Sequence, residues 1–340
     1  MNKTLLKELC TIDGISGREH AVREYILDKL NGSSAPKEVT VDALGNVLVH
    51  LYGKNEATAT VLFDAHMDEV GFMITNINDD GSLCFSTVGG IENEALFGRR
   101  VRVGNINGVI GGKPVHQCSA EEKNTVPKAE DMAIDIGATD KHEAEALVAI
   151  GQGGTFVSPL CELSNDLFFA KAVDDRIGCA VLLSLAEKQP ERDVWLSFSV
   201  QEEIGCRGAK VVGESVKPQV AIAIDATTAA DIADSTEKTC VCRVGGGPVV
   251  SFADRATLYD EELYMRIRSL AEDANIPTQT KTRIAGGNNA AALQRSHTGV
   301  KMAAVSLPCR YIHTASCTAA WRDAEALESL ILLLAERLTL

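Results

Sequence analysis

The sequence predicts an α/β protein, a sandwich of helices around a sheet, with a small β-rich unit inserted into it. From about residue 165 to the end, short apolar runs of strand length alternate with longer segments of helical periodicity, which is typical of an α/β sandwich. Between about residues 70 and 160, helical periodicity is scarce and short alternating runs rich in Gly, Val, Ile and Asn dominate. We therefore predict two parts, residues 1–69 with 161–340, and an insert over 70–160.

The first part is predicted to contain one helix and three strands. A helix is expected from Glu19 to Leu30, because apolar residues repeat there at helical spacing: Val22, Ile26, Leu27 and Leu30. The stretch Asp42–Asn46 has turn chemistry and separates two strand-like runs. The predicted strands are Val39–Val41, Asn46–Leu51 and Thr60–Ala65.

After the insert, the same criteria predict further strands and helices in alternation. The strands are expected at Val194–Val200, Val220–Ile224 and Val300–Leu307. The helices are expected at Gly178–Glu187, Leu258–Ala274 and Ala324–Leu338. The last helix carries five apolar residues on one face, which predicts that this face packs against the sheet.

Length and charge narrow the class of protein. A chain of 340 residues fits about two domains, and its 45% hydrophobic and 24% charged residues are ordinary for a globular protein. Because the formal net charge is −14, we expect no nucleic-acid partner. No segment has the length and apolarity of a signal peptide or a membrane span, so we expect a cytoplasmic protein without a membrane partner. The ten cysteines include no CxxC pair and are expected to be reduced, buried thiols.

Polar clusters follow several of the predicted strands, where ligands collect in an α/β sheet. His66 and Asp68 lie two residues apart at the end of one strand and should point the same way. A histidine that binds a metal commonly donates its other ring N–H to a carboxylate, and Asp68 can accept it. A lone histidine at a strand end is more often inert, so the neighbouring carboxylates carry the hypothesis.

Further carboxylates occur after other strands, and each has a simpler interpretation as well. Glu202 and Glu203 end a buried strand, where two carboxylates are costly unless a cation neutralises them, although a solvated acidic loop is the alternative. Asp174 could bridge two metals while Arg176 holds Asp175, but taken alone these residues favour the simpler interpretation, in which Asp174 or Asp175 caps the following helix. Asp225 and His313 are weak signals alone.

Together these residues suit a site for two metal ions. Each ion would receive one histidine, one terminal carboxylate and a share of a bridging carboxylate. Nitrogen and oxygen ligands without thiolate suit Zn, Co or Mn, and such pairs of ions occur in aminopeptidases. A carboxylate that binds no metal must then move a proton to the leaving amine, and Glu202 is the natural candidate.

At these residues the sequence resembles the tetrahedral (TET-type) metallo-aminopeptidases, a family that includes glutamyl and deblocking aminopeptidases and some members labelled endoglucanase. The resemblance covers nearly the whole chain. Its most specific motifs are Ala65-His-Met-Asp-Glu-Val-Gly71 and Lys171-Ala-Val-Asp-Asp-Arg176. Supporting motifs are Ile15-Ser-Gly17-x-Glu19 with Val22-Arg23, Asp42-x-x-Gly-Asn46, Gln201-Glu-Glu203, Arg207-Gly-Ala209, Gly247-Pro248 and Arg310-Tyr-Ile-His313.

The resemblance implies a role for each site residue. His66 and Asp225 would bind one metal, Glu203 and His313 the other, and Asp174 would bridge them. Glu202 would be the general base, and Asp68 would orient His66. Similar proteins have a zinc-peptidase-like catalytic domain with an inserted PDZ-like dimerisation domain. The resemblance therefore implies two divalent ions per subunit, peptide substrates with a free N-terminus, and a homo-oligomer that is at least a dimer and in many relatives a dodecamer.

One departure bears on substrate preference. The family usually has Gly-Thr-Asp-Ala before the last histidine strand, whereas this chain has Gly286-Gly-Asn-Asn-Ala-Ala291, so an amide replaces an aspartate expected near the substrate. Two other functions remain open at this point. Glu202 and Glu203 could be the acid and nucleophile of a glycosidase, although 5% aromatic residues are few for a sugar cleft. The chain could also be a non-catalytic assembly protein that kept the fold.

Overall fold

The computed structural model describes residues 1–55 and 59–338. The α-helices are α1 (Lys3–Thr11), α2 (His20–Gly32), α3 (Lys141–Leu147), α4 (Val173–Ala186), α5 (Arg207–Val216), α6 (Glu261–Asp273), α7 (Ala290–Gln294) and α8 (Trp321–Arg337). The strands before the insert are β1 (Lys37–Val41), β2 (Val47–Leu51) and β3 (Val61–His66). Those within it are β4 (Gly71–Ile77), β5 (Leu83–Val88), β6 (Arg100–Val103), β7 (Ile106–Gly112), β8 (Met132–Asp135) and β9 (Gly153–Phe156). The later strands are β10 (Cys161–Glu162), β11 (Leu167–Ala170), β12 (Val194–Ser199), β13 (Val220–Thr228), β14 (Val249–Ser251), β15 (Gln279–Thr280), β16 (Lys301–Cys309) and β17 (Cys317–Ala320).

One eight-stranded mixed sheet forms the centre of the larger part, in the order β1-β2-β12-β3-β13-β16-β14-β15. The four central strands β12, β3, β13 and β16 are parallel to one another. They are apolar almost throughout, as strands buried on both faces must be. Their carboxyl ends therefore meet at one edge of the sheet, which is where the sequence places the polar clusters.

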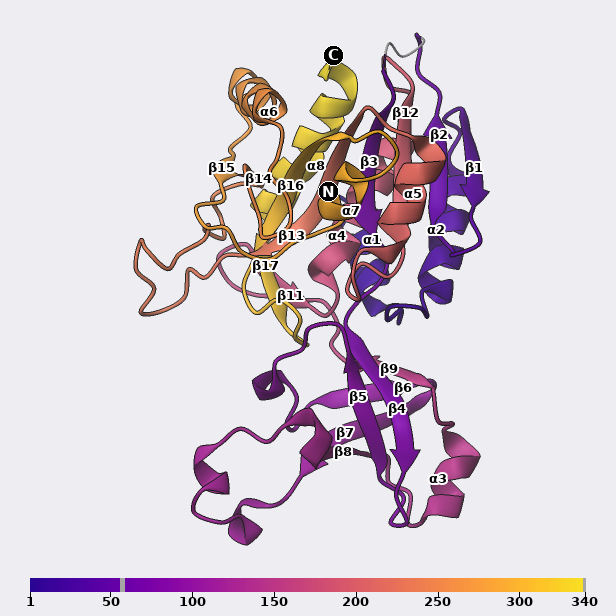
Figure 1. The fold of residues 1–340 in the computed structure, drawn as a ribbon, viewed down its shortest axis with the longest axis vertical. Coiled ribbons are helices and arrows are strands. Elements are labelled where there is room, and N and C mark those ends of the chain that lie inside the picture. The colour runs from indigo at the N-terminus through magenta and orange to yellow at the C-terminus, as the bar shows by residue number, and fades with distance from the viewer. Residues whose placement is uncertain (56–58, 339–340) are drawn as a thin grey trace.

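Helices cover both faces of this sheet (Figure 1). Helix α4 packs on β3 and β13 and contacts α1, α2 and α8, and these helices share the largest hydrophobic core with the sheet. On the other face α5 and α7 pack together against β12, β13 and β16 around a smaller core. The three-layer arrangement confirms the predicted α/β fold.

The strands between Gly71 and Phe156 close into a six-stranded barrel, β4-β5-β8-β7-β6-β9, which extends below the sheet in Figure 1. The barrel has its own core, in which the ring of Phe72 lies edge-on to those of Phe85 and Phe156. Polar contacts join it to the rest of the chain: Arg102 donates two hydrogen bonds to Asp13, at 2.6 and 2.7 Å.

The predicted strands and helices are confirmed, with shifted ends. The largest shift is at α4, which is bounded by Val173 instead of Gly178; the backbone is kinked and non-helical at Asp174 and Asp175, and regular helix follows them. Helices α1, α3, α5 and α7 were not predicted; each has ten residues or fewer, which leaves a short run in which to recognise a helical repeat. None of the helices within residues 1–55 and 59–338 combines the length and apolarity needed to cross a membrane.

Candidate metal centre

The predicted ligands meet at the carboxyl edge of the central strands. His66 ends β3, Asp225 lies in β13, Asp174 is in the first turn of α4, and Glu203 follows β12. His313 lies in the loop between β16 and β17, with its backbone in the left-handed region at φ 59°. Ligand atoms of His66, Asp174 and Asp225 lie within 4.8 Å of one another, and so do those of Asp174, Glu203 and His313.

His66 is oriented with one ring nitrogen toward the other ligands. Its Nδ1 lies 3.1 Å from the carbonyl oxygen of Asp68, which can only accept, so Nδ1 carries the proton. Its Nε2 faces Asp174 Oδ1 at 3.0 Å and Asp225 Oδ1 at 3.9 Å. The Nε2 lone pair therefore faces carboxylate oxygens, an arrangement that needs a proton or a cation between them.

Asp174 is shared between the two histidines. Its Oδ1 faces His66, and its Oδ2 lies 3.3 Å from Nε2 of His313. Four ligand atoms around one tetrahedral zinc ion lie about 3.3 Å apart, so these separations fit a carboxylate that bridges two ions. The side chain is buried, and the predicted cap of the following helix is instead its neighbour Asp175, which accepts from the N–H of Gly178 at 3.0 Å.

His313 mirrors His66 on the other side of Asp174. Its Nε2 lies 3.3 Å from Glu203 Oε2, while its Nδ1 donates to the carbonyl of Gly90 at 2.8 Å. Gly90 belongs to the inserted segment, which also contributes this residue to the cavity lining beside the ligands. The insert therefore supplies one backbone group that orients a candidate ligand.

The raised pKa values of several candidate ligands indicate that the site favours positive charge. Burial and the nearby Asp174 carboxylate raise the pKa of Glu203 to about 8, and burial raises the pKa of Asp225 well above its usual range. Burial acts to lower the pKa of His313, but hydrogen bonding to Asp174 and the charge of Glu203 raise it to about 10. Divalent cations would replace these protons, so the donor set fits metal ions.

Glu202 and Asp68 lie next to the ligands with different partners. After β12 the chain turns at Gln201, where φ is 57°, and both following glutamates line the cavity beside the ligands. The Asp68 carboxylate accepts from the backbone N–H groups of Glu202 and Glu203 at 2.9 and 3.1 Å, and from the Ser16 hydroxyl at 2.6 Å. The Glu202 carboxylate accepts from the Cys206 thiol at 3.4 Å and borders the cavity, and burial raises its pKa.

The prediction that Arg176 holds Asp175 is wrong. The Asp175 carboxylate accepts from the backbone N–H groups of His66 and Gly178, at 3.1 and 3.0 Å. The buried Arg176 guanidinium donates to the carbonyls of Met67, Leu9 and Ile12 and lies 3.5 Å from Glu69. Asp175 therefore fixes the end of β3 without a charged partner, because local backbone groups satisfy it.

Asn289, which stands where the family usually has an aspartate, does not lie at the surface of the cavity. Asn289 is buried, and its amide donates to Asp64 at 2.7 Å and to Ser199 at 2.8 Å. These partners belong to β3 and to the last residue of β12, away from the cavity lining. Asn288, its neighbour, does line the cavity and accepts from the backbone of Ala290.

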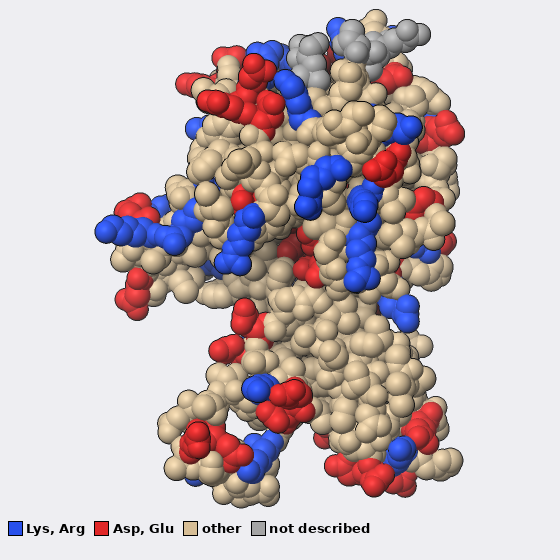
Figure 2. Space-filling view, in the orientation of Figure 1, with Lys and Arg blue, Asp and Glu red and all other residues tan. Residues whose placement is uncertain are grey.

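A cavity of about 380 Å³ opens beside the ligands. Figure 2 shows acidic side chains inside a hollow on this face, with lysine and arginine side chains around its upper rim. The lining includes Lys281 and Cys206, which sequence reasoning missed because single residues in loops carry no periodic signal. Glu19, which belongs to one of the supporting motifs, accepts from the N–H groups of Gly17 and Gln201, at 2.7 and 3.0 Å, and so supports the turn before Glu202.

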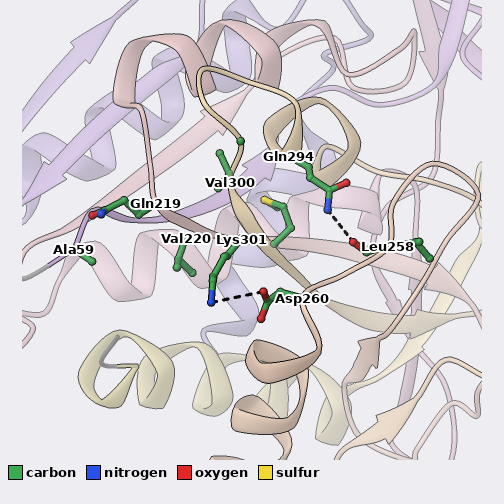
Figure 3. Close-up of a pocket in the computed structure, with 10 residues that line it drawn as sticks. Ala59, Gln219, Val220, Leu258, Asp260, Gln294, Val300 and Lys301 are labelled. Carbon is green, nitrogen blue, oxygen red and sulfur yellow. Dashed lines mark hydrogen bonds and ion pairs between the residues drawn. The ribbon is translucent and has the colours of Figure 1, made fainter.

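A larger cavity, about 760 Å³, lies at the amino ends of the central strands (Figure 3). Val220 and Lys301, the first residues of β13 and β16, line it, together with Leu258 and Asp260. Its charged lining residues, Lys301 and Asp260, lie 3.8 Å apart and pair with each other. No cluster of potential metal ligands in the described ranges includes a residue of this cavity.

Comparisons with known proteins agree with this geometry. The family model of the M42 glutamyl aminopeptidases matches residues 45–330. The lysyl aminopeptidase of Pyrococcus furiosus is 32% identical over 331 residues, which are 94% of this chain and 93% of the relative. The glutamyl aminopeptidase of Lactococcus lactis is 28% identical over 322 residues, 91% of this chain and 88% of the relative. The solved TET1 peptidase of Pyrococcus horikoshii, which can assemble into a tetrahedron or a large octahedral shell, is 35% identical with a TM-score of 0.86, and the match covers 98% of this chain and 99% of that one. The chain therefore belongs to the M42 glutamyl aminopeptidase family of metal-dependent peptide hydrolases.

Proposed function

We propose that this aminopeptidase holds two divalent ions, zinc or cobalt, and removes residues from the free amino end of peptides. His66 and Asp225 would hold one ion, His313 and Glu203 the other, and Asp174 both. The observation that carries the proposal is the position of Asp174, whose two oxygens face the two histidines at 3.0 and 3.3 Å. The ions would polarise the scissile carbonyl and lower the pKa of the attacking water.

The remaining residues have roles that follow from their contacts. Glu202 borders the cavity and carries no backbone hydrogen bond on its carboxylate among the described residues, so it is free to accept a proton from the attacking water and return it to the leaving amine. Asp68 holds the proton of His66 at Nδ1, as outer partners of metal-bound histidines do, and fixes the turn that carries both glutamates. The carboxylates around the cavity would hold the ammonium group of the substrate.

The alternative functions are supported less well. A glycosidase with two catalytic carboxylates gives the two oriented histidines no role. A non-catalytic protein has no need to keep all five ligand positions and a cavity beside them. The family match supports the hydrolase as well.

The test combines metal content with activity on defined substrates. Elemental analysis of the purified protein should give two divalent ions per chain. A panel of aminoacyl-p-nitroanilides should be hydrolysed, and N-acetylated versions of the same compounds should be hydrolysed far more slowly, because the ammonium group is lost. Equal rates on acetylated and free substrates would contradict the exopeptidase assignment.

We also propose that residues 70–160 form a PDZ-like dimerisation domain and that the chain assembles at least into a dimer, with a dodecamer as the larger form. The barrel exposes apolar side chains, among them Phe97 (51%), Val115 (73%) and Ile150 (63%). The TET1 relative forms closed shells. Light scattering at micromolar concentration should show an oligomer, and a monomer would overturn the proposal. Ten free cysteines fit the reducing cytoplasm, which we propose as the location.

A further inference from the structure

A short segment between α1 and α2, Asp13–Glu19, contacts both the metal centre and the barrel. It contains the first of the supporting sequence motifs. On the side of the metal centre, the hydroxyl of Ser16 donates to Asp68 at 2.6 Å. The carboxylate of Glu19, which is 4% exposed, accepts from the backbone N–H of Gln201 at 3.0 Å. Two side chains of the segment therefore bind the groups that support the candidate ligands.

Glu19 helps to hold a backbone conformation that is unfavourable by itself. Gln201 has φ 57°, in the left-handed region, which costs energy for a residue other than glycine. Such a conformation persists only where its surroundings fix it. Here Glu19 accepts from the N–H of Gln201, and Asp68 accepts from the next two N–H groups. Without Glu19 the turn would lose the contact at its strained residue, and the Glu202 carboxylate would be held less firmly at the cavity.

The same segment is attached to the barrel at its other end. Asp13 accepts the two hydrogen bonds from Arg102 of β6. The N–H of Gly14 donates to Oε1 of Glu69 at 3.1 Å, and Oε2 of that carboxylate accepts from the Thr155 hydroxyl of β9 at 2.8 Å. Side chains of two barrel strands make these contacts, so the barrel determines where the segment lies.

Part of this junction is hollow. A cavity of about 220 Å³ lies between the segment and the barrel, and its lining includes Ile15 of the segment and Gln152 of the barrel. Arg102 and Asp13 line it as well. Dispersion contacts are lost where a cavity separates two surfaces, so the hydrogen bonds beside it carry more of the attachment. The pair of Arg102 with Asp13 is therefore a main contact through which the barrel can act on the segment.

We propose that Arg102 and Glu19 are positioning residues for the reaction. Arg102 fixes the segment Asp13–Glu19 against the barrel, and Glu19 fixes the turn that carries Glu202. This rests on the proposed function, which assigns proton transfer to Glu202. The coupling follows a continuous physical path, from a charged pair of hydrogen bonds through a short loop to a further hydrogen bond.

The first test changes Glu19 and measures kcat and KM of the metal-loaded enzyme on the aminoacyl-p-nitroanilide that the wild type hydrolyses fastest. Oε1 of Glu19 accepts both from Gly17 and from Gln201, so the amide oxygen of Gln can replace it, whereas Met fills the space without an acceptor. Glu19→Met should lower kcat about 10-fold, the lower end of the cost of losing an outer partner of a metal centre. KM should stay within about 2-fold, because the contact serves the transition state. Glu19→Gln should retain at least about half of kcat, since the hydrogen bonds remain.

The second test changes Arg102, whose side chain is 32% exposed, so that the variant is expected to fold. Arg102→Met should lower kcat about 3–10-fold, comparable with the net contribution of one hydrogen bond. Arg100→Met is the matched control, because Arg100 belongs to the same strand and is exposed; its kcat should equal that of the wild type. In the double variant of Arg102→Met with Glu19→Met, the two losses should not multiply, because both act through the same segment.

The outcomes separate this inference from the proposed function. Wild-type kcat in Glu19→Met, an equal loss in Glu19→Gln, or losses that multiply in the double variant would each overturn the inference while leaving an aminopeptidase. If Glu19→Met fails to fold, the comparison of Arg102→Met with Arg100→Met decides, and equal kcat values in these two would overturn it. No turnover of any free aminoacyl substrate by the metal-loaded wild type would overturn the proposed function and this inference together.

Discussion

The cavities at the two ends of the central strands differ in whether their charged residues neutralise one another. At the amino ends, the larger cavity has one lysine and one aspartate, which pair with each other and remain partly open to water. At the carboxyl ends, a cavity of half that volume is lined by four carboxylates. Their neighbours are two histidines and one lysine, Lys281, which forms no ion pair within residues 1–55 and 59–338. A choice by volume alone would select the cavity at the amino ends as the functional site. Buried charge that the described residues leave unneutralised favours the other cavity as the one that would bind ions and substrate.

The largest effect should follow from removing the shared ligand. In Asp174→Ala both histidines lose the carboxylate that they share, so metal content should fall from two ions per chain to at most one, weakly held. Activity should fall by more than the roughly 10–100-fold that changes to outer partners of metal ligands cost. Elemental analysis after dialysis checks this, and two tightly bound ions in the variant would refute the bridging assignment.

Substitutions of the neighbouring residues Glu202 and Glu203 should separate a loss of catalysis from a loss of metal binding. Glu202→Gln should keep both ions and lose about 10²–10⁴-fold in kcat, because the amide cannot accept a proton. Glu203→Gln is the matched control and should instead weaken binding of one ion. Titration with metal chelators alongside kinetics distinguishes them, and the reverse pattern would mean that the two roles are exchanged.

Metal-free protein should become less stable as pH rises from 6 to 9. The pKa of Glu203 is raised to about 8 and that of His313 to about 10, so the folded state holds more protons than the unfolded state over this range. Stability from such groups is full below their unfolded pKa and is lost as pH rises through the folded value. Asp174 and Asp68 have lowered pKa values, which act at acidic pH outside this window. Melting temperatures with and without metal check this; a fall of the same size in the metal-loaded protein would contradict it.

The smallest effect is expected at the opposite cavity. Lys301 lies 3.8 Å from Asp260 and 3.3 Å from Glu262, and its side chain is 51% exposed. Exposed ion pairs contribute about 0–1 kcal/mol, so Lys301→Ala should change the free energy of unfolding by no more than that and leave metal content unchanged. Chemical denaturation provides the measurement. Loss of metal in this variant would show that the two ends are coupled.

Much of this centre could be predicted because its residues follow apolar strands. His66, Asp225 and Glu203 each come at or near the end of such a run, and parallel strands bring those ends together. Contacts between loops could not be predicted. Lys281 and Gly90 reach the cavity through turns with no periodic pattern, and the partners of Arg176 are backbone carbonyls, which no side-chain motif reveals.

The hydrogen bond from His313 to Gly90 has a consequence for protein engineering. The barrel looks like a module that could be exchanged for another assembly unit, since it has its own hydrophobic core and enters and leaves the larger part through neighbouring strands, β4 and β9. Yet one carbonyl oxygen of that module orients the imidazole of His313, a proposed metal ligand. A functional chimera must therefore carry its junctions around residues 89–91, so that the transplanted barrel brings its fold and the recipient keeps its own histidine anchor.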